Sequence, residues 1–322
     1  MMKKIVSILL TAVMSLSILA GCSSNNEASV VRVASLKGPT SIGLLKLMDD
    51  SSKGEANNSY EFTMATTADE VLPKMISGEL DIALVPANVA AVLYNKTEGK
   101  VKVIDINTLG VLYAVSGDNS VSKVSDLRGK TIYITNMGTT PDYVTQLLLA
   151  ANGIALDEVT IEYKSEATEV AATLKEHPEA VGILPQPFVT AACIQNQELS
   201  PVLDLTAEWD AAVKDGSRLV TGVTVARTDF IDGNKKAIAA FLEEHKASCE
   251  YVSSDVEGCA SLVVSSGIIE KEPVALKAIP KCNVTYIDGD DMKAALSGYL
   301  KALFDMDATT VGGKLPDENF YY

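Results

Sequence analysis

Short hydrogen-bonding side chains gather where the chain turns from a predicted strand into a predicted helix. The first such turn lies within the stretch SLKGPTSIGLLKLM, from Ser35 to Met48, and contains Gly and Pro, which break both kinds of structure. A helix start leaves free backbone N–H groups and a partial positive charge, which are either capped by the chain or used to hold a ligand. This turn alone leaves both possibilities open.

Five turns of the sequence share this pattern, and each follows the carboxyl end of a predicted strand. Open parallel sheets bind their ligands along that edge. The polar candidates in these turns are Lys37, Thr40, Ser41, Thr66, Thr67, Asn88, Asn136, Thr139, Thr140 and Gln186. Any one of them could be only a helix N-cap, but five turns at one edge favour a ligand-binding cleft.

Apolar strands and amphipathic helices alternate along the chain, as in an α/β protein with a largely parallel sheet. The predicted strands are SVVRVASL, YEFTMA and DIALV in the first half, and KTIYIT, VTIEYKS and AVGILP in the second. An apolar strand in RLVTGVTVARTDFI then leads out of the second half, and the remaining tail is predicted to be largely helical.

Two of the predicted helices have recognisable starts. Thr67 and Glu70 have the spacing of a capping box. Pro73 falls inside the same helix, where we expect it to cause a kink. In the second half, Pro141 is predicted to occupy the first helical position, with Thr140 as the cap.

The N-terminal residues have the pattern of an export signal. The basic start MMKK precedes the apolar run IVSILLTAVMSLSILA, which is short for a membrane span. The following LAGC resembles the bacterial lipobox, in which Cys22 becomes the first mature residue and carries a diacylglyceryl group. An ordinary signal peptide with a chance cysteine is the alternative. We therefore expect a leader at 1–21, a tether at 22–29, and anchoring outside the cytoplasm on the membrane of a Gram-positive bacterium.

The net charge of −15 limits the classes of partner. Nucleic acid requires basic patches, and an acidic body is also unsuited to anionic lipid. The two histidines, His177 and His245, lie in the charged stretches KEHPE and EEHKA, and we predict that both are on the surface. The sequence therefore predicts no metal site, no cofactor and no histidine-activated nucleophile.

Four cysteines follow Cys22, and none of them has Cys-x-x-Cys spacing. They are Cys193, Cys249, Cys259 and Cys282. Disulfides can form outside the cytoplasm, but a chain of 322 residues can build a sufficient core without them. We expect that these cysteines are not all paired and that folding requires no disulfide.

Three stretches of the mature chain carry a resemblance to a known family. They are GELDIALVPANVAAVLYNKT, VSDLRGKTIYITNMGTTPDYVTQLLLAANGI and AVGILPQPFVTAA. In this order they resemble the substrate-binding lipoproteins of nitrate/sulfonate/taurine-type ABC importers, a family that also serves the uptake of thiamine precursors and riboflavin. The similarity extends from Val30 to the end of the chain.

This resemblance implies a type II periplasmic-binding-protein fold, in which two α/β lobes are joined by two crossing strands and enclose the ligand. It maps one lobe to 30–112 and 221–322 and the other to 113–220. It also implies an ABC permease and an ATPase as partners. The chain has no P-loop pattern of its own, so its expected role is recognition.

The class of ligand is open at this stage. Lys37 is the only cation in the candidate turns, Arg128 is expected to lie away from them, and Arg218 and Arg227 could face either way. A small anion such as a sulfonate or carboxylate is our first expectation. A neutral heterocycle such as a thiamine precursor is the alternative, although Trp209 is the only tryptophan available for stacking. Enzymes of pyrimidine synthesis and of the menaquinone pathway share the implied fold but lack a lipobox, and a structural lipoprotein is a third class.

Overall fold

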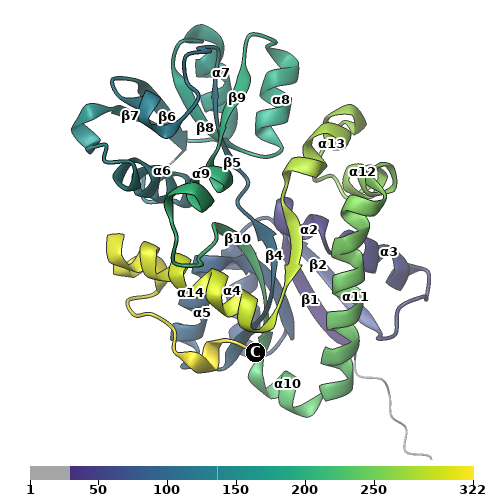
Figure 1. Ribbon diagram of the computed structural model, residues 1–322. Coiled ribbons are helices and arrows are strands. Elements are labelled where there is room, and N and C mark those ends of the chain that lie inside the picture. Colours follow the sequence, from purple (N-terminus) through teal and green to yellow (C-terminus); the bar gives the residue numbers. More distant parts are fainter. Residues whose placement is uncertain (1–29, 136) are drawn as a thin grey trace, which may run out of the picture. The chain divides into compact units, whose positions relative to one another are not determined.

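The strands of the described chain form two mixed sheets, one of six strands and one of five. The computed structural model describes residues 30–135 and 137–322, and Val31–Tyr322 form one compact unit (Figure 1). The leader and tether expected at 1–21 and 22–29 lie outside the described residues. Within the described part of the chain, no helix has the length and apolar character needed to cross a membrane.

We refer to the six-stranded sheet as sheet A. Its strand order is β11-β4-β10-β3-β1-β2. The strands are β1 (Val31–Leu36), β2 (Tyr60–Ala65), β3 (Ile82–Pro86), β4 (Val101–Leu109), β10 (Val220–Arg227) and β11 (Val284–Ile287). β1 pairs in parallel with β2 and β3, whereas β10 runs antiparallel to both β3 and β4.

Helices cover both faces of sheet A. They are α2 (Pro39–Ile42), α3 (Leu45–Ser52), α4 (Ala68–Ser77), α5 (Ala87–Lys96), α10 (Thr228–Gly233), α11 (Lys235–Ser254), α12 (Val256–Ser265), α13 (Glu272–Ala278) and α14 (Gly289–Met306), with 3₁₀ turns at Ile279–Lys281, Ala308–Val311 and Glu318–Phe320. On β3, Ile82 and Leu84 pack in one cluster with α3 and α11, while Ala83 and Val85 pack in another with α4, α5 and α14. Because both faces are buried, this strand is a continuous apolar run.

We refer to the five-stranded sheet as sheet B, with the order β7-β6-β8-β5-β9. Its strands are β5 (Leu112–Ser116), β6 (Thr131–Thr135), β7 (Thr160–Lys164), β8 (Val181–Pro185) and β9 (Ser200–Asp204). Its helices are α6 (Thr140–Ala151), α7 (Ala167–Glu176), α8 (Phe188–Gln195) and α9 (Leu205–Ala212), with 3₁₀ turns at Val124–Leu127 and Leu156–Glu158. β6 is parallel to β7 and β8, and β5 is antiparallel to β8 and β9.

Helix α4 forms as its sequence predicts. Thr67 is the N-cap, Glu70 completes the capping box, and Gly78 ends the helix with a φ of 82°, which a residue with a side chain rarely adopts. Pro73 lies inside the helix, but its side chain is exposed. The carbonyl that loses its intrahelical bond to Pro73 therefore faces water, which accommodates the misfit.

Two helix starts differ from the sequence expectation. The single helix expected after β1 is two short helices, α2 and α3, separated at Gly43. A Cβ at Gly43 would lie 2.8 Å from the Cys249 sulfur, so the close approach of α11 requires glycine here. The N-cap of α6 is Thr139 rather than Thr140, and Pro141 is the second helical residue. The second helical position tolerates proline because a backbone N–H at this position would have no partner within the helix.

The α/β class with two sheets is confirmed. Sheet A takes its strands from Val31–Leu109 and Val220–Ile287, and sheet B takes them from Leu112–Asp204. Leu112 begins β5 of sheet B and Val220 begins β10 of sheet A, and the lobe boundaries expected at 112/113 and 220/221 stay predictions. That the two sheets move as separate lobes stays a prediction.

Candidate functional site

A two-residue link joins the carboxyl edges of the two sheets. β4 runs in the same direction as β3, because β10 is antiparallel to both, and β4 therefore ends at the carboxyl edge of sheet A. After Gly110 and Val111 the chain enters β5, whose first residue, Leu112, pairs with Pro185 at the carboxyl end of β8. The turns that follow the parallel strands of both sheets therefore flank this link.

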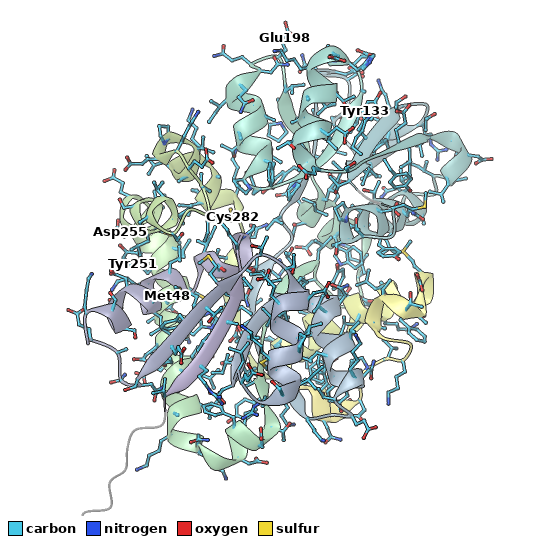
Figure 2. All side chains as sticks on the ribbon, turned by 180° about the vertical axis from the view of Figure 1, so that it is seen from behind. Met48, Tyr133, Glu198, Tyr251, Asp255 and Cys282 are labelled. Carbon is cyan, nitrogen blue, oxygen red and sulfur yellow. The ribbon has the colours of Figure 1, made fainter. Side chains whose placement is uncertain are left out.

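A backbone N–H next to sheet B and a side chain next to sheet A both donate hydrogen bonds to the link. The Gln186 backbone N–H donates to the Val111 carbonyl at 2.9 Å, and Asn283 Nδ2 donates to the Gly110 carbonyl at 2.5 Å. Tyr113 Oη donates to the Lys281 carbonyl at 3.2 Å. Cys282, which is labelled in Figure 2, is buried and lies between Lys281 and Asn283 in the chain. The crossing is thus held by hydrogen bonds from each side.

The turn after β1 places three buried hydroxyl groups at this edge. Ser41 Oγ donates to the Leu36 carbonyl at 2.6 Å and lies 2.7 Å from Ser35 Oγ, and Thr40 Oγ1 donates to the same carbonyl at 3.2 Å. Each hydroxyl oxygen retains capacity to accept a further hydrogen bond. Sequence reasoning identified Thr40 and Ser41 but missed Ser35, which faces the turn from the end of its strand.

Lys37 is exposed in the same turn and forms no ion pair with any described residue. The three arginines weighed from the sequence all pair with carboxylates. Arg128 pairs with Glu158, and Arg218 Nε lies 3.0 Å from Asp210 Oδ1. Arg227 bonds Asp81 at the opposite edge of sheet A, with 3.3 Å between Nη2 and Oδ1. Lys37 therefore remains the cation of the candidate turns.

The starts of α4 and α6 are occupied by carboxylates of the chain. Glu70 Oε1 accepts the backbone N–H groups of Thr66 and Thr67 at 3.0 and 2.9 Å. These backbone bonds, that of Thr67 first, lower the pKa of Glu70 below its ordinary value. Asp142 Oδ2 accepts the Gly138 N–H at 2.8 Å, and the Asp142 side chain is buried. Thr66 and Thr67 thus serve the cap of α4, and both are exposed.

The starts of α5 and α8 differ. Within the described chain, neither helix has an acidic residue in its first turn or a side-chain hydrogen bond at its N-cap. Asn88 lies half-buried in the first turn of α5. Gln186 immediately precedes Pro187, the N-cap of α8. These two starts leave their backbone donors available at the edges that flank the link.

Gln186 is the most informative of the predicted residues. Its side chain is 1% exposed, and its Oε1 accepts a hydrogen bond from Thr190 Oγ1 at 2.8 Å. Its Nε2 has no hydrogen-bond partner among the described residues. Thr206, which follows β9 at the same edge, likewise has a buried hydroxyl without a partner in the described chain. Sequence reasoning missed Thr206 because β9 was not predicted.

The remaining candidates from the turn after β6 are less informative. Thr139 Oγ1 donates to the Thr135 carbonyl at 3.1 Å, and Thr140 is half-buried in the first turn of α6. Asn136 lies outside the described residues. The lipidation site, Cys22, is also outside them.

The prediction that both histidines lie on the surface is wrong for His245. His245 is fully buried on α11, and its Nδ1 lies 3.1 Å from Oδ2 of the equally buried Asp105. Burial alone lowers the pKa of His245, but Cys249 and Asp105 beside it raise that pKa well above its usual value. His177 is half exposed, as expected, with 53% of its side chain accessible.

A row of buried polar side chains extends from His245 toward the candidate edge. Thr224 Oγ1 donates to Asp105 Oδ1 at 2.7 Å, and Asn107 Nδ2 donates to Thr224 Oγ1 at 3.1 Å. A Cβ at Gly222 would lie 2.5 Å from Asn107 Oδ1 and 2.4 Å from the Thr40 methyl group. The row therefore ends beside Thr40, under the turn that follows β1.

All four described cysteines are free thiols. Cys249, Cys259 and Cys282 are buried, and Cys193 is partly buried on α8. Burial raises the pKa of Cys259 to about 11, which keeps this thiol protonated at neutral pH. Among the described residues, no group of three or more His, Cys, Asp or Glu side chains could hold a metal ion.

Comparison with known proteins supports the family resemblance from which we predicted the fold. Residues 53–210 match the sequence model of a family described as ABC transporter, phosphonate, periplasmic substrate-binding protein. This match covers just under half of the chain. A binding protein of Brucella abortus (strain 2308) is 22% identical to this chain over 236 residues, 71% of this chain and 70% of the relative.

Solved structures with similar folds agree with the expected architecture. An ABC transporter protein from Parabacteroides distasonis has a TM-score of 0.76 at 24% identity and covers 91% of this chain and 98% of its own. The periplasmic aliphatic sulphonate binding protein SsuA from Escherichia coli has a TM-score of 0.72 at 13% identity and covers 91% and 92%. The expected periplasmic-binding-protein fold is therefore confirmed.

Proposed function

We propose that this chain is a substrate-binding protein that recognises a small organic anion, such as a sulfonate or carboxylate, between the carboxyl edges of sheets A and B. In this proposal, Lys37, Thr40 and Ser41 contact the ligand from sheet A, and Gln186 contacts it from sheet B. The other predicted residues, Thr66, Thr67, Asn88, Asn136, Thr139 and Thr140, line the walls of the cleft, and of these only Asn88, at the open start of α5, is proposed to contact the ligand. The segments 30–112 with 221–322 and 113–220 act as lobes that close on the ligand by bending at the link.

The buried amide of Gln186 carries this proposal. An unpaired polar group in the interior destabilises a fold by about 1–3 kcal/mol. Such a group is retained where a ligand supplies the missing acceptor. Gln186 Nε2 is such a donor, and its backbone N–H is bonded to the link between the sheets. A ligand oxygen at this position would be held at the point where both sheets meet.

The charge of Lys37 supports an anionic ligand. The relatives point the same way, because one neighbour in fold binds aliphatic sulphonates and the matching family is described by phosphonate. The open starts of α5 and α8 add backbone donors and a favourable dipole for a negative charge.

A neutral heterocycle is the second candidate, and a specific observation favours it. Glu70 and Asp142 place negative charge at the starts of α4 and α6, which disfavours an anion close to either helix. Stacking would need a ring other than Trp209, which is 1% exposed and packs edge-on against Tyr299, with ring centroids 5.8 Å apart.

We infer recognition rather than turnover. Asp105, His245 and Cys249 form an acid–imidazole–thiol row, with 3.6 Å between His245 Nε2 and the Cys249 sulfur. This row would be the obvious candidate for nucleophilic catalysis. All three side chains are buried between α11 and sheet A, so a substrate cannot reach them. A permease and an ATPase would receive the ligand.

The proposed anchor can be tested separately from binding. We expect Cys22→Ser to abolish lipidation and release the protein from the membrane, because Cys22 is the proposed acceptor of the diacylglyceryl group. Ligand affinity and the melting temperature of the soluble body should not change. Retention of the variant on membranes, measured by fractionation of the producing cells, would contradict the lipobox interpretation.

A ligand screen tests the proposed ligand class. Short sulfonates, carboxylates and phosphonates are compared with thiamine precursors and flavins by thermal shift, followed by calorimetry. A ligand at a hundredfold excess over its Kd stabilises the folded state by about 2.7 kcal/mol. We expect anions to raise the melting temperature without being consumed. Stabilisation by the neutral heterocycles alone would replace the anion proposal with its alternative, and consumption of a stabilising ligand would indicate an enzyme.

A further inference from the structure

A cavity of about 400 Å³ lies between α8 and the segment that joins α12 to α13. Figure 1 shows α8 and α13 side by side, and the two helices are in contact. Most of the cavity lining is apolar, and its main contributors are Phe188, Ala191, Ile194, Ile268, Ile269 and Val274. Its volume is within the range of small-molecule sites, about 300–1,000 Å³.

Both walls of this cavity continue directly from the proposed binding residues. On the side of sheet B, Pro187 and Phe188 follow Gln186 in the chain. On the other side, Ile268 follows Gly267, and a Cβ at Gly267 would lie 3.5 Å from the Lys37 ammonium nitrogen. A ligand bound to Lys37 and Gln186 therefore has this cavity as its neighbour.

The chemistry of the cavity suits an uncharged organic group. Lys271 and Glu270 both line it, so their opposite charges largely offset each other. Phe188 is 39% exposed and Ile194 is 40% exposed, which leaves apolar surface in contact with water in the absence of a ligand. Contiguous apolar surface of this kind marks a binding site more often than a solvated face.

We propose that this cavity receives the apolar part of the ligand, so that the substrate class is an organic anion with a medium-length alkyl chain or one ring rather than a minimal anion. This inference rests on the proposed function, because the head group is held by Lys37 and Gln186. The cavity then determines specificity through the length and width of the apolar part.

Calorimetry with a homologous series tests this inference. Ethanesulfonate, butanesulfonate and hexanesulfonate share one head group and differ only in the alkyl chain. Each buried methylene should tighten binding by about fourfold, so burial of even two of the four additional methylenes should make hexanesulfonate bind at least tenfold more tightly than ethanesulfonate. Carboxylates and phosphonates of the same chain lengths are measured in parallel, in case the head group is not a sulfonate.

Two variants test whether the preference for long alkyl chains arises in this cavity. Ala191→Phe fills the cavity from α8 and should remove the preference for long chains while leaving ethanesulfonate binding unchanged. Phe188→Ala removes one wall and should weaken only the long-chain ligands, and it serves if Ala191→Phe does not fold. Ala150→Phe makes the same change at an exposed position of α6 and is the matched control.

The outcomes separate this inference from the proposed function. A chain-length preference that is lost in Ala191→Phe and kept in Ala150→Phe supports the cavity. Binding of short anions without any chain-length preference, or a preference unchanged in both cavity variants, would overturn the inference and leave the proposed function standing. Failure of every anion to bind would overturn the proposed function, and the inference with it.

Discussion

The helix starts at the edges of the two sheets fall into two chemically different pairs. At α4 and α6, a first-turn carboxylate, Glu70 or Asp142, accepts backbone N–H groups that lie just before the helix. At α5 and α8, within the described chain, there is no acidic residue in the first turn. The sequence pattern of a polar turn after a strand is common to all four. The difference teaches that a helix start is available to a ligand only where the chain does not supply its own acceptor.

The largest effect is expected at the open start of α8. Gln186→Met keeps the length of the side chain and removes the unpaired donor. A hydrogen bond to a charged ligand contributes about 1.5–3 kcal/mol, so we expect ligand affinity to fall by tenfold or more in calorimetry. The melting temperature without ligand should change little, because the loss of the unpaired Nε2 group offsets the loss of the hydrogen bond from Thr190 Oγ1 to Gln186 Oε1.

The matched control for this variant is Gln197→Met, at an exposed position just beyond α8. It should change neither affinity nor stability. Equal affinities of the Gln186 variant and the wild type would place the ligand elsewhere and assign Gln186 a structural role. The functional distinction between the starts of α4 and α6 and those of α5 and α8 would then not hold.

A smaller effect is expected at Lys37. Its replacement tests how much a positive charge alone contributes to ligand affinity. Lys37→Met should weaken an anionic ligand by about fivefold, because an exposed charge pair contributes up to about 1 kcal/mol. The affinity of the wild type for the anion should also fall more steeply with added salt than that of the variant. Lys236→Met, at an exposed position on α11, is the control. A loss at Gln186 with no change at Lys37 would favour the neutral heterocycle.

No effect on binding is expected at the occupied start of α4. Glu70→Gln weakens the acceptor of two backbone N–H groups, so the melting temperature should fall at neutral pH while ligand affinity stays the same. Because the folded-state pKa of Glu70 is lowered, its contribution to stability is present above about pH 4.5 and is lost as the pH falls through the folded-state value.

The melting temperatures of the wild type and the Glu70 variant should therefore converge as the pH falls below the folded-state pKa of Glu70. Asp69→Asn, in the same first turn, controls for the loss of a negative charge near the helix dipole. A clear change of ligand affinity in Glu70→Gln would mean that α4 takes part in binding, and the distinction between the two pairs would not hold.

Much of the fold could be predicted because its strands are apolar runs between clear turn signals. β1, β2, β3, β6, β7 and β8 were all predicted from this pattern. β4 was missed because three buried polar residues, Asp105, Asn107 and Thr108, interrupt its apolar pattern. β9 and β11 are short and only partly buried, so their sequences carry little apolar signal.

The candidate site was less predictable because its chemistry depends on tertiary contacts. The spacing of Thr139 and Asp142 resembles that of Thr67 and Glu70, so the occupied start of α6 could have been recognised. His245 was misread from its charged neighbours, although Phe241, His245 and Cys249 follow the four-residue spacing of a buried helical face. The unpaired amide of Gln186 has no sequence signal at all.

The order of strands has a consequence for how the protein is made. All strands of sheet B come from one continuous segment, Leu112–Asp204, whereas sheet A places β10 (Val220–Arg227) between β3 and β4. As the chain emerges from its N-terminus, sheet B can be completed while β3 and β4 still lack the strand that joins them. Until β10 arrives, both strands present unpaired edges, which are sites of aggregation. Sheet A is therefore the part of this protein that most needs protection during synthesis and export.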